Sequence, residues 1–159
     1  MVVMNTTWHW RSFISNLLSR QFLDLVRPVL REGGILYYNS TGSREVHRTA
    51  SMNYPYTTRF TTMMLASEAP IRADAARWEA VMRQYRIDGR PVIPADPEAE
   101  RVLGYNRERF LVMDAVGPEY HDWNTMESRE RILAETEGRR EITDDNMGLE
   151  WRREKPSYY

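Results

Sequence analysis

The first forty residues of this 159-residue chain follow a strand–helix–strand pattern, which limits the possible folds more than any other feature. Met1–Asn5 is apolar and β-branched, as buried strands are, and Ile35–Asn39 is a second short run of apolar and aromatic residues. Between them, apolar residues recur at the spacing of one helix face, at Phe22, Leu25, Val26, Val29 and Leu30. Strands joined through a helix in this way are parallel, so the sequence predicts a βαβ unit.

The residues around this helix indicate where it begins and ends. Ser15, Asn16 or Ser19 offers a side-chain oxygen that can cap its first turn. Pro28 lies inside the apolar pattern and predicts a kink or a weakened hydrogen bond. Gly33-Gly34 predicts the end of the helix, because glycine readily adopts the left-handed conformation that follows a last turn.

A second helix and a tight strand pair are expected next. Ser43 can cap a helix that runs to about Met52, and Tyr54-Pro55 ends it because the residue before proline avoids the helical region. Tyr56–Phe60 and Thr62–Ser67 read as strands, and the connection between them is too short for a crossover. The sequence therefore predicts that these two strands pair antiparallel.

Residues 71–159 predict a mixture of helices and strands. The expected features are a helix capped by Asp74, a turn at Asp88-Gly89, a linker around Pro91, Pro94 and Pro97, a short helix over Glu98–Gly104, a strand over Arg109–Val116, and a helix from Thr125 or Glu127 to about Glu137. Arg139–Tyr159 is expected to be extended or loose, with only Ile142, Met147, Leu149 and Trp151 as apolar anchors.

Composition excludes several classes of protein. The chain has no cysteine, which excludes disulfides, thiolate catalysis, zinc fingers and iron–sulfur clusters. Its longest apolar run, Met1–Met4, is far shorter than the roughly 20 residues of a membrane span or the roughly 7–15 of a signal sequence. We therefore expect no membrane segment and a cytoplasmic location.

Charge is balanced overall at −1 but divided along the chain. Residues 1–90 hold 12 arginines against 7 acidic residues, and residues 91–159 hold 10 basic against 16 acidic residues. Either the two halves attract each other within one molecule, or the basic half binds an anion. An isoelectric point near 6.3 argues against nucleic acid as the partner.

Known catalytic motifs are absent from the sequence. It contains neither a glycine-rich phosphate loop nor the G-x-S-x-G motif of a hydrolase nucleophile. The histidines, His9, His47 and His121, do not have the spacing of metal ligands. We therefore predict no metal site.

The best candidate for a binding site follows the first strand. Ligands of open α/β sheets bind at the carboxyl ends of the strands, where Asn5 and the segment containing His9, Trp10 and Arg11 lie. A titratable imidazole, a guanidinium and flat rings could form a substrate pocket. Alternatively, the tryptophans only cover the edge of the sheet. Asn39 ends the second strand and could either line the same pocket or cap a turn.

A second candidate is the polar cluster Thr143-Asp144-Asp145-Asn146. Its adjacent carboxylates, Asp144 and Asp145, could bind a divalent cation or an amine, although the alternating spacing of a calcium loop is absent. The other interpretation is a turn held by hydrogen bonds from side chains to the backbone.

Several of these segments together resemble one known family. They are Asn5-Thr6-Thr7 after a strand, Asn16-Leu17-Leu18-Ser19, Phe22-Leu23, Gly33-Gly34-Ile35-Leu36-Tyr37-Tyr38-Asn39, Tyr54-Pro55, Met63–Pro70 with Ser67, Ile142-Thr143-Asp144-Asp145-Asn146, and Glu150-Trp151. This pattern resembles the C-terminal half of the spermidine-synthase-like proteins, which have the class I methyltransferase fold and bind S-adenosyl compounds. The matching residues cover most of 1–70 and a patch near 142–151.

The resemblance implies a specific fold. It is an α/β fold with a partial Rossmann-like methyltransferase sheet, in which parallel strands are completed by an antiparallel hairpin. Residues 1–70 would form this half-domain, and residues 71–159 a mixed α+β extension packed on it. In the family's strand order the first strand here would sit beside a strand that this chain lacks. We therefore expect self-association, or a partner chain, to cover the first strand.

The resemblance also implies a function and its limits. S-adenosylmethionine or its decarboxylated form would be the cofactor, although the family's nucleotide-binding half has no counterpart here. Where the family carries a catalytic aspartate, this chain has Asn5-Thr6-Thr7-Trp8, and an amide cannot accept a proton as a carboxylate does. One hypothesis is thus a spermidine-synthase-like transferase fragment or subunit, inactive alone and binding no cofactor by itself. The other is a non-catalytic interaction module that uses the half-sheet as a scaffold.

Overall fold

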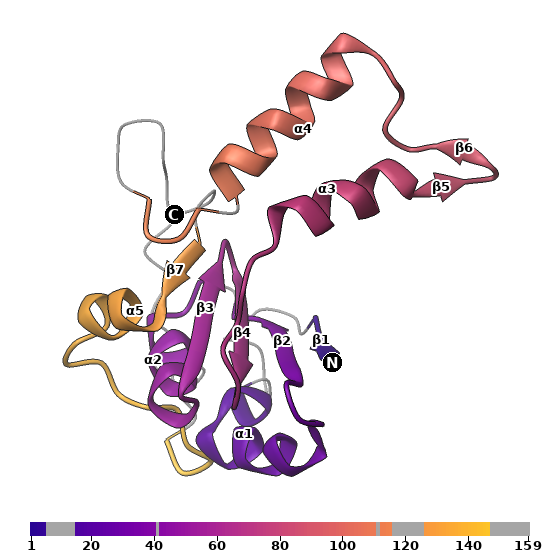
Figure 1. Ribbon diagram of the computed structural model, residues 1–159. Helices are drawn as coiled ribbons and strands as arrows, with labels where there is room; N and C mark the ends of the chain where they lie inside the picture. The colour runs from indigo at the N-terminus through magenta and orange to yellow at the C-terminus, as the bar shows by residue number, and fades with distance from the viewer. Residues whose placement is uncertain (6–14, 41, 111, 116–125, 147–159) are drawn as a thin grey trace.

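The computed structural model describes residues 1–5, 15–40, 42–110, 112–115 and 126–146 (Figure 1). The strands are β1 Val2–Met4, β2 Ile35–Asn39, β3 Tyr56–Phe60, β4 Met63–Ser67, β5 Arg86–Ile87, β6 Arg90–Pro91 and β7 Met126–Ser128. The helices are α1 Arg20–Val26, α2 Arg44–Asn53, α3 Ala75–Gln84, α4 Pro97–Phe110 and α5 Arg129–Glu135, with short 3-10 helices η1 Ser15–Leu18 and η2 Arg27–Val29.

The main sheet is mixed and has the strand order β1-β2-β4-β3-β7. β1 and β2 are parallel, which confirms the predicted pairing of the first two strands. β3 and β4 form the predicted antiparallel hairpin, with β4 placed between β2 and β3. The chain is therefore an α/β protein with parallel strands completed by antiparallel ones.

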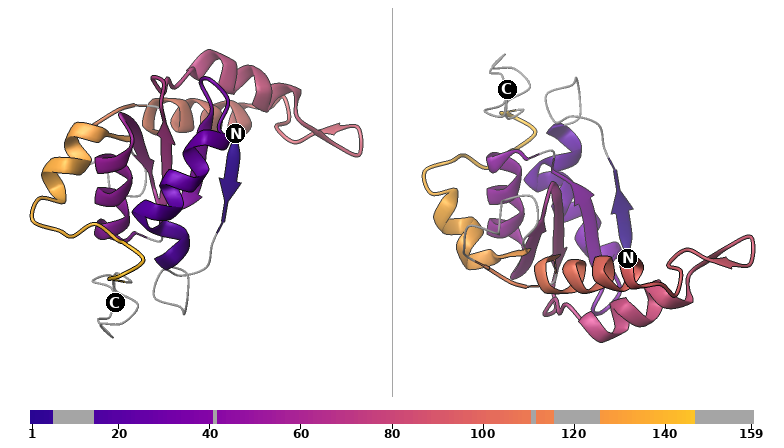
Figure 2. Two further views of the ribbon diagram at one scale, coloured as in Figure 1. Left: turned by 90° about the horizontal axis from the view of Figure 1, so that it is seen from below. Right: turned by 90° about the horizontal axis from the view of Figure 1, so that it is seen from above.

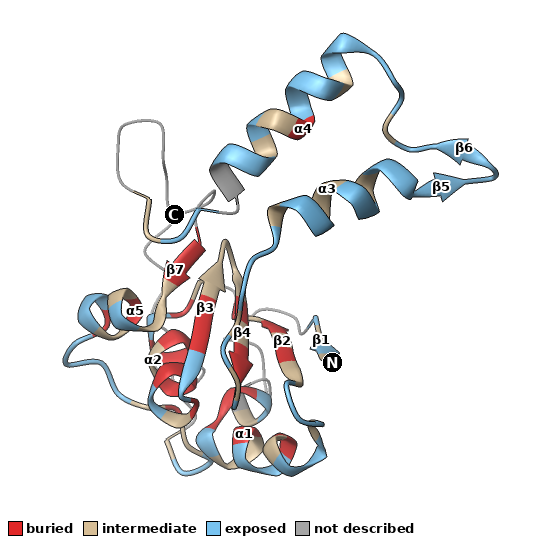
Figure 3. Cartoon of the chain, viewed as in Figure 1, coloured by how far each residue is buried: buried red, intermediate tan, exposed pale blue. Residues whose placement is uncertain are grey.

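One face of this sheet carries the core. Leu36 lies opposite both Val2 and Ala66, so these side chains share a face, and Tyr38 and Met64 follow in the next row. Leu36, Tyr38, Met64 and Ala66 have no exposed area. Leu23 and Val26 of α1, Val46 and Ala50 of α2, and Ile132 of α5 pack against this face (Figure 3). The sheet and these helices thus form two layers around a single core.

Helix α1 differs from its predicted form. Ser19 caps it, since its side-chain oxygen accepts a hydrogen bond from the Phe22 N–H, and η2 around Pro28 continues it as a tighter turn. Leu25 and Val29 belonged to the predicted buried face, yet they are 72% and 68% exposed. The change to 3-10 geometry over Arg27–Val29 breaks the 3.6-residue periodicity and accounts for the exposure of Val29. Leu25 lies within α1, whose buried residues are Leu23 and Val26, so it faces away from the core. Gly33 has the predicted left-handed conformation, with φ of 66°.

The segment from α3 to α4 forms an arm that extends away from the sheet (Figures 1 and 2). Asp74 caps α3 as predicted, and Asp88-Gly89 forms the predicted turn, between β5 and β6. The helix expected over Glu98–Gly104 is longer, because α4 continues to Phe110. The strand expected from Arg109 is consequently wrong, and among the described residues of this segment only Met113 makes an isolated bridge, to Met126.

The end of the described chain returns to the core. The helix predicted from Thr125 or Glu127 begins instead at Arg129, capped by Ser128, and Met126–Ser128 adds strand β7 beside β3. Ile142 is buried in the core, and its N–H donates to the Thr49 hydroxyl at 2.8 Å. Part of the segment expected to be loose is therefore anchored. The division into residues 1–70 and 71–159 remains a prediction, and the core draws on both.

Candidate functional site

The carboxyl ends of β1 and β2 meet at one edge of the sheet, where sequence analysis placed a pocket. The side-chain amide of Asn39 donates to the side-chain Oδ1 of Asn5 at 3.1 Å, and this hydrogen bond is exposed. Two of the candidate residues are thus brought together by the parallel pairing of their strands. An amide pair at this edge presents both hydrogen-bond donors and acceptors to a ligand.

Three further candidates, His9, Trp10 and Arg11, lie outside the described residues. Their proposed role in a pocket beside Asn5 stays a prediction.

A buried serine–histidine pair lies directly behind this edge. Ser40 follows Asn39, and its Oγ is 2.8 Å from Nε2 of His47 on α2. The Ser40 hydroxyl also lies 2.8 Å from the Thr62 carbonyl oxygen, to which it donates. A hydroxyl has one proton to donate, and Ser40 gives it to Thr62, so Nε2 of His47 is the donor in the hydrogen bond to Ser40. Ser40 is fully buried and His47 is 3% exposed, so the pair connects β2, α2 and the β3–β4 turn.

No prediction from the sequence joined Ser40 and His47 as a pair. The available signal was His47 one turn after the capping Ser43, which directs the imidazole toward the loop after β2. Both side chains are buried, and their contact ties α2 to the residue that follows β2. The pair does not present a nucleophile to a substrate.

The Asp144–Asp145 cluster is attached to α1. Ser19 Oγ donates to the Asp144 carboxylate at 2.6 Å, and the Asp144 N–H donates to the Gln21 side chain at 3.2 Å. Asn146 closes the turn by accepting from the Thr143 N–H at 3.0 Å. The bond between Thr143 and Asn146 corresponds to the turn interpretation, and the two bonds of Asp144 join this turn to Ser19 and Gln21. In the part of the chain that the structure describes, no group of three potential metal-ligating side chains is found.

Tyr38 places a polar atom inside the core next to this site. It precedes Asn39 on β2 and is fully buried, and its hydroxyl has no hydrogen-bond partner among the described residues. Burial raises the pKa of Tyr38 far above its ordinary value, and the neighbouring Tyr54 raises it further. The Tyr38 phenol is therefore neutral at physiological pH and contributes a buried, unpaired dipole.

Comparison with known proteins adds no assignment. No family model, curated protein or solved structure matches this chain. Among the helices formed by described residues, none is long and apolar enough to cross a membrane.

Proposed function

We propose that this chain supplies the closing half of a spermidine-synthase-like sheet that binds an S-adenosyl nucleoside. The observation that carries the proposal is the parallel β1–β2 pair whose carboxyl ends bring Asn5 and Asn39 into contact. Ligands of open α/β sheets bind at this position, and S-adenosylmethionine or its decarboxylated form is the ligand that the resemblance implies.

The edge position of β1 supports the proposal. β1 is the terminal strand of the sheet, and no described residue pairs with its outer side. Val3 at its centre is 55% exposed. An apolar edge strand of this kind favours the addition of another strand. In this proposal the added strand comes from a partner chain or from polypeptide outside residues 1–159, and it carries the part of the nucleotide site missing here.

The chemistry of the strand ends limits what the chain does alone. Asn5 and Asn39 can hydrogen-bond a ribose hydroxyl or an adenine edge, but an amide does not act as a general base. In place of a chain that binds no cofactor by itself, we therefore propose that this chain alone binds the nucleoside through these two amides. Aminopropyl or methyl transfer then requires a base from the completing half.

A second candidate is a non-catalytic interaction module. The arm favours it, because Val81, Tyr85 and Ile87 are each more than half exposed. Apolar surface of this kind marks contact sites for other proteins.

Calorimetry separates these candidates. The chain is titrated with S-adenosylmethionine, methylthioadenosine and spermidine, alongside an Asn39→Ala variant and an Asn106→Ala control on α4. The first proposal predicts heat with at least one compound, lost in Asn39→Ala and kept in the control. Absence of heat with all three compounds leaves only the interaction module.

A further inference from the structure

One side of the arm carries charged residues that pair with one another. Arg83 of α3 donates to Glu79 at 2.6 Å and to both carboxylate oxygens of Glu100 on α4, at 2.6 and 2.7 Å. Arg107 of α4 donates to Glu79 at 3.2 Å. Because the end of α3 meets the start of α4 in these contacts, the two helices run antiparallel. This side of the arm is a surface of compensated charges, as is typical of a helix side in contact with water.

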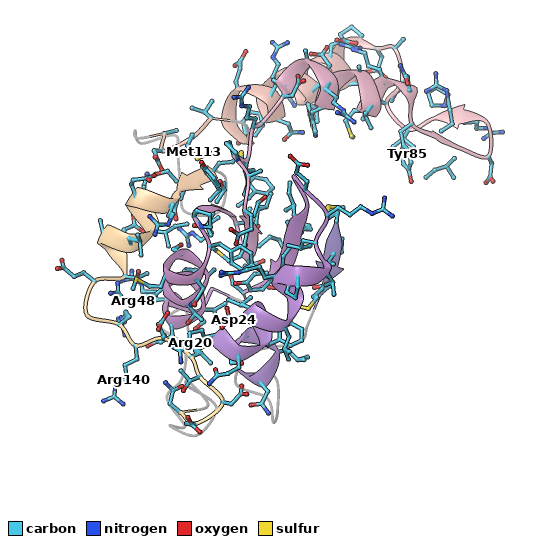
Figure 4. The ribbon with its side chains drawn as sticks, turned by 60° about the horizontal axis from the view of Figure 1, so that its bottom comes forward. Arg20, Asp24, Arg48, Tyr85, Met113 and Arg140 are labelled. Carbon is cyan, nitrogen blue, oxygen red and sulfur yellow. The ribbon has the colours of Figure 1, made fainter. Side chains whose placement is uncertain are left out.

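The other side of the arm is apolar. Val81 and Tyr85 stand two residues before and two residues after Arg83, which places both of them on the opposite side of the helix from the paired charges. Val102 stands in the same relation to Glu100 on α4. Figure 4 shows the Tyr85 side chain standing out from the arm beside the hairpin. The arm is therefore amphipathic, with its apolar side exposed.

The hairpin of β5 and β6 continues this apolar side. The Val92 N–H donates to the Tyr85 carbonyl oxygen at 3.0 Å, which extends the β5–β6 register and sets Tyr85 opposite Val92. Ile87 follows two residues after Tyr85 and shares its side of the hairpin. We call these residues the arm face, and their exposed fractions are 56% for Val81, 55% for Tyr85, 57% for Ile87, 39% for Val92 and 40% for Val102.

The apolar stripe of the arm is wider than a contact between two helices requires. Trp78 and Met82 of α3 are partly buried and Leu103 of α4 is buried, as expected of residues that lie between the paired helices. Val81, Tyr85 and Val102 form a second stripe beside that contact. A double stripe is typical of helices that pack in a bundle of more than two. The arm thus has the pattern of half a four-helix bundle.

We infer that two copies of this chain pack arm face to arm face, with their arms antiparallel, and form a four-helix bundle around a two-fold axis. The charges at the two ends of the arm face favour this occupant. Arg77 is exposed one turn before Val81, at the start of α3. Glu98, which also pairs with Arg101, is exposed one turn before Val102, at the opposite end of the arm. An antiparallel two-fold arrangement brings Arg77 of each copy to Glu98 of the other, so the surface is complementary to itself.

The exposed area agrees with a small dimer interface. Tyr85 leaves about 110 Å² open and the four aliphatic side chains leave roughly 50 Å² each, which gives roughly 300 Å² of apolar surface. A small specific interface buries about 600 Å² on each partner, of which about 340 Å² is apolar. The alkyl stems of Arg77 and of Arg90, which lies opposite Ile87, supply the remainder at the rim. We therefore expect a dimer of micromolar affinity.

A lipid surface fits the arm less well than a second copy. Amphipathic helices that lie on membranes carry a basic polar side, which anionic lipids attract. The polar side of the arm instead pairs each arginine with a glutamate. The inference gives a partner to the arm of the interaction-module candidate, and it does not depend on nucleoside binding.

The mass in solution is the first test. Light scattering on the full chain at about 100 micromolar should give twice the chain mass of 18.9 kDa. Ile87→Glu should raise the dissociation constant about tenfold or more, because it places a charge in an apolar contact. Leu25→Glu is the matched control, since Leu25 is 72% exposed on α1, outside the arm, and its substitution should leave the dimer intact. A monomer at about 100 micromolar, or a dimer that Ile87→Glu does not weaken, overturns the inference and leaves the calorimetric test of nucleoside binding unaffected.

Exchange of charges tests the direction of the arms. Arg77→Glu sets two carboxylates against each other in both symmetric contacts and should raise the dissociation constant about fivefold. Adding Glu98→Arg restores an opposite pair and should return the dissociation constant to within about twofold of wild type. Arg77→Glu combined with Glu108→Arg has the same net charge, but Glu108 is exposed outside the arm face, so this variant should stay weak. Equal dissociation constants for the two double variants contradict the antiparallel arrangement.

Cross-linking shows which residues face each other, since the natural chain has no cysteine. An equal mixture of Arg77→Cys and Glu98→Cys chains, treated with a short bis-maleimide, should give a linked pair, whereas either variant alone should not. A product from Glu98→Cys alone places the two hairpin ends together and refutes the antiparallel arrangement. A dimeric mixture that gives no linked pair refutes it as well.

Discussion

The ion pair between Arg59 and Glu127 offers a sharp test of how the end of the chain joins the sheet. Arg59 on β3 donates two hydrogen bonds to the carboxylate of Glu127 on the neighbouring β7. The Glu127 side chain is 1% exposed and that of Arg59 is 13% exposed. Arg131 Nε is 3.9 Å from the same carboxylate. The Glu127 carboxylate therefore provides most of the opposite charge that stabilises the Arg59 guanidinium, which is largely removed from water.

Glu127→Gln removes this charge at nearly constant volume. Breaking a buried ion pair by removing one charge costs about 3–5 kcal/mol, because the remaining charge stays buried without compensation. We expect the lower end, about 3 kcal/mol, since Arg59 keeps some contact with water and glutamine can still accept one hydrogen bond. For a domain of this size the melting temperature should fall by roughly 6–12 °C.

Urea unfolding followed by circular dichroism measures this loss, with Glu135→Gln as the control. Glu135 pairs with Arg131 at 2.8 Å but is 43% exposed, so its substitution should cost less than about 0.5 kcal/mol. Because no charge then remains buried, Arg59→Met combined with Glu127→Leu should recover most of the stability. A cost of Glu127→Gln below about 1 kcal/mol would refute the claim that this pair holds β7.

Three other predictions concern single contacts. Tyr38→Phe removes a buried hydroxyl that has no hydrogen-bond partner among the described residues. In urea unfolding this variant should be as stable as wild type or more stable by up to about 1 kcal/mol. A loss of stability of more than about 1 kcal/mol would show that the hydroxyl has a partner. Because burial raises the Tyr38 pKa, wild type should also lose more stability than this variant above about pH 10. Asp144→Ala removes the side chain that accepts the hydrogen bond from Ser19, the N-cap of α1, and should cost about 1 kcal/mol in the same assay. Asp145 is likewise exposed but lacks this bond to Ser19, so Asp145→Ala should be neutral, and equal costs for the two variants would contradict this. A hydrogen bond from Arg83 lowers the pKa of Glu100, so the pair stabilises the arm above about pH 4.5 and loses this effect as the pH falls further. Hydrogen exchange should therefore show that peptides of the arm open first at low pH. Equal protection of these peptides at about pH 3 and about pH 6 would contradict this.

The sequence predicted the N-terminal part of the fold, up to β4, well because the patterns that indicate its elements lie within a few residues of each other. The second strand, Ile35–Asn39, the Ser43 cap of α2 and the β3–β4 hairpin each depend on neighbouring residues, and all three are confirmed. Parallel pairing of the first two strands followed from their separation by a helix. The contact between Asn5 and Asn39 then follows from that pairing.

The errors lie where long-range contacts decide the structure. Met126–Ser128 has a glutamate at its centre, and that residue is stable in a buried strand only because Arg59 faces it, 68 residues earlier in the chain. Ile142, one of the expected apolar anchors, is in the core, but its hydrogen bond to the Thr49 hydroxyl is a contact that no local pattern indicates. The Ser40–His47 pair is different, because its residues are close in sequence and the position of His47 one turn after Ser43 was an available local signal.

The central claim, that the edge formed by β1 and β2 binds an S-adenosyl nucleoside, is tested most directly by nuclear magnetic resonance. The side-chain amide signals of ¹⁵N-labelled asparagine are followed while S-adenosylmethionine or methylthioadenosine is added. The proposal predicts that the Asn5 and Asn39 signals shift together and saturate, while the Asn106 signal on the arm stays in place. Unchanged Asn5 and Asn39 signals at millimolar nucleoside, or shifts confined to other asparagines, would contradict it.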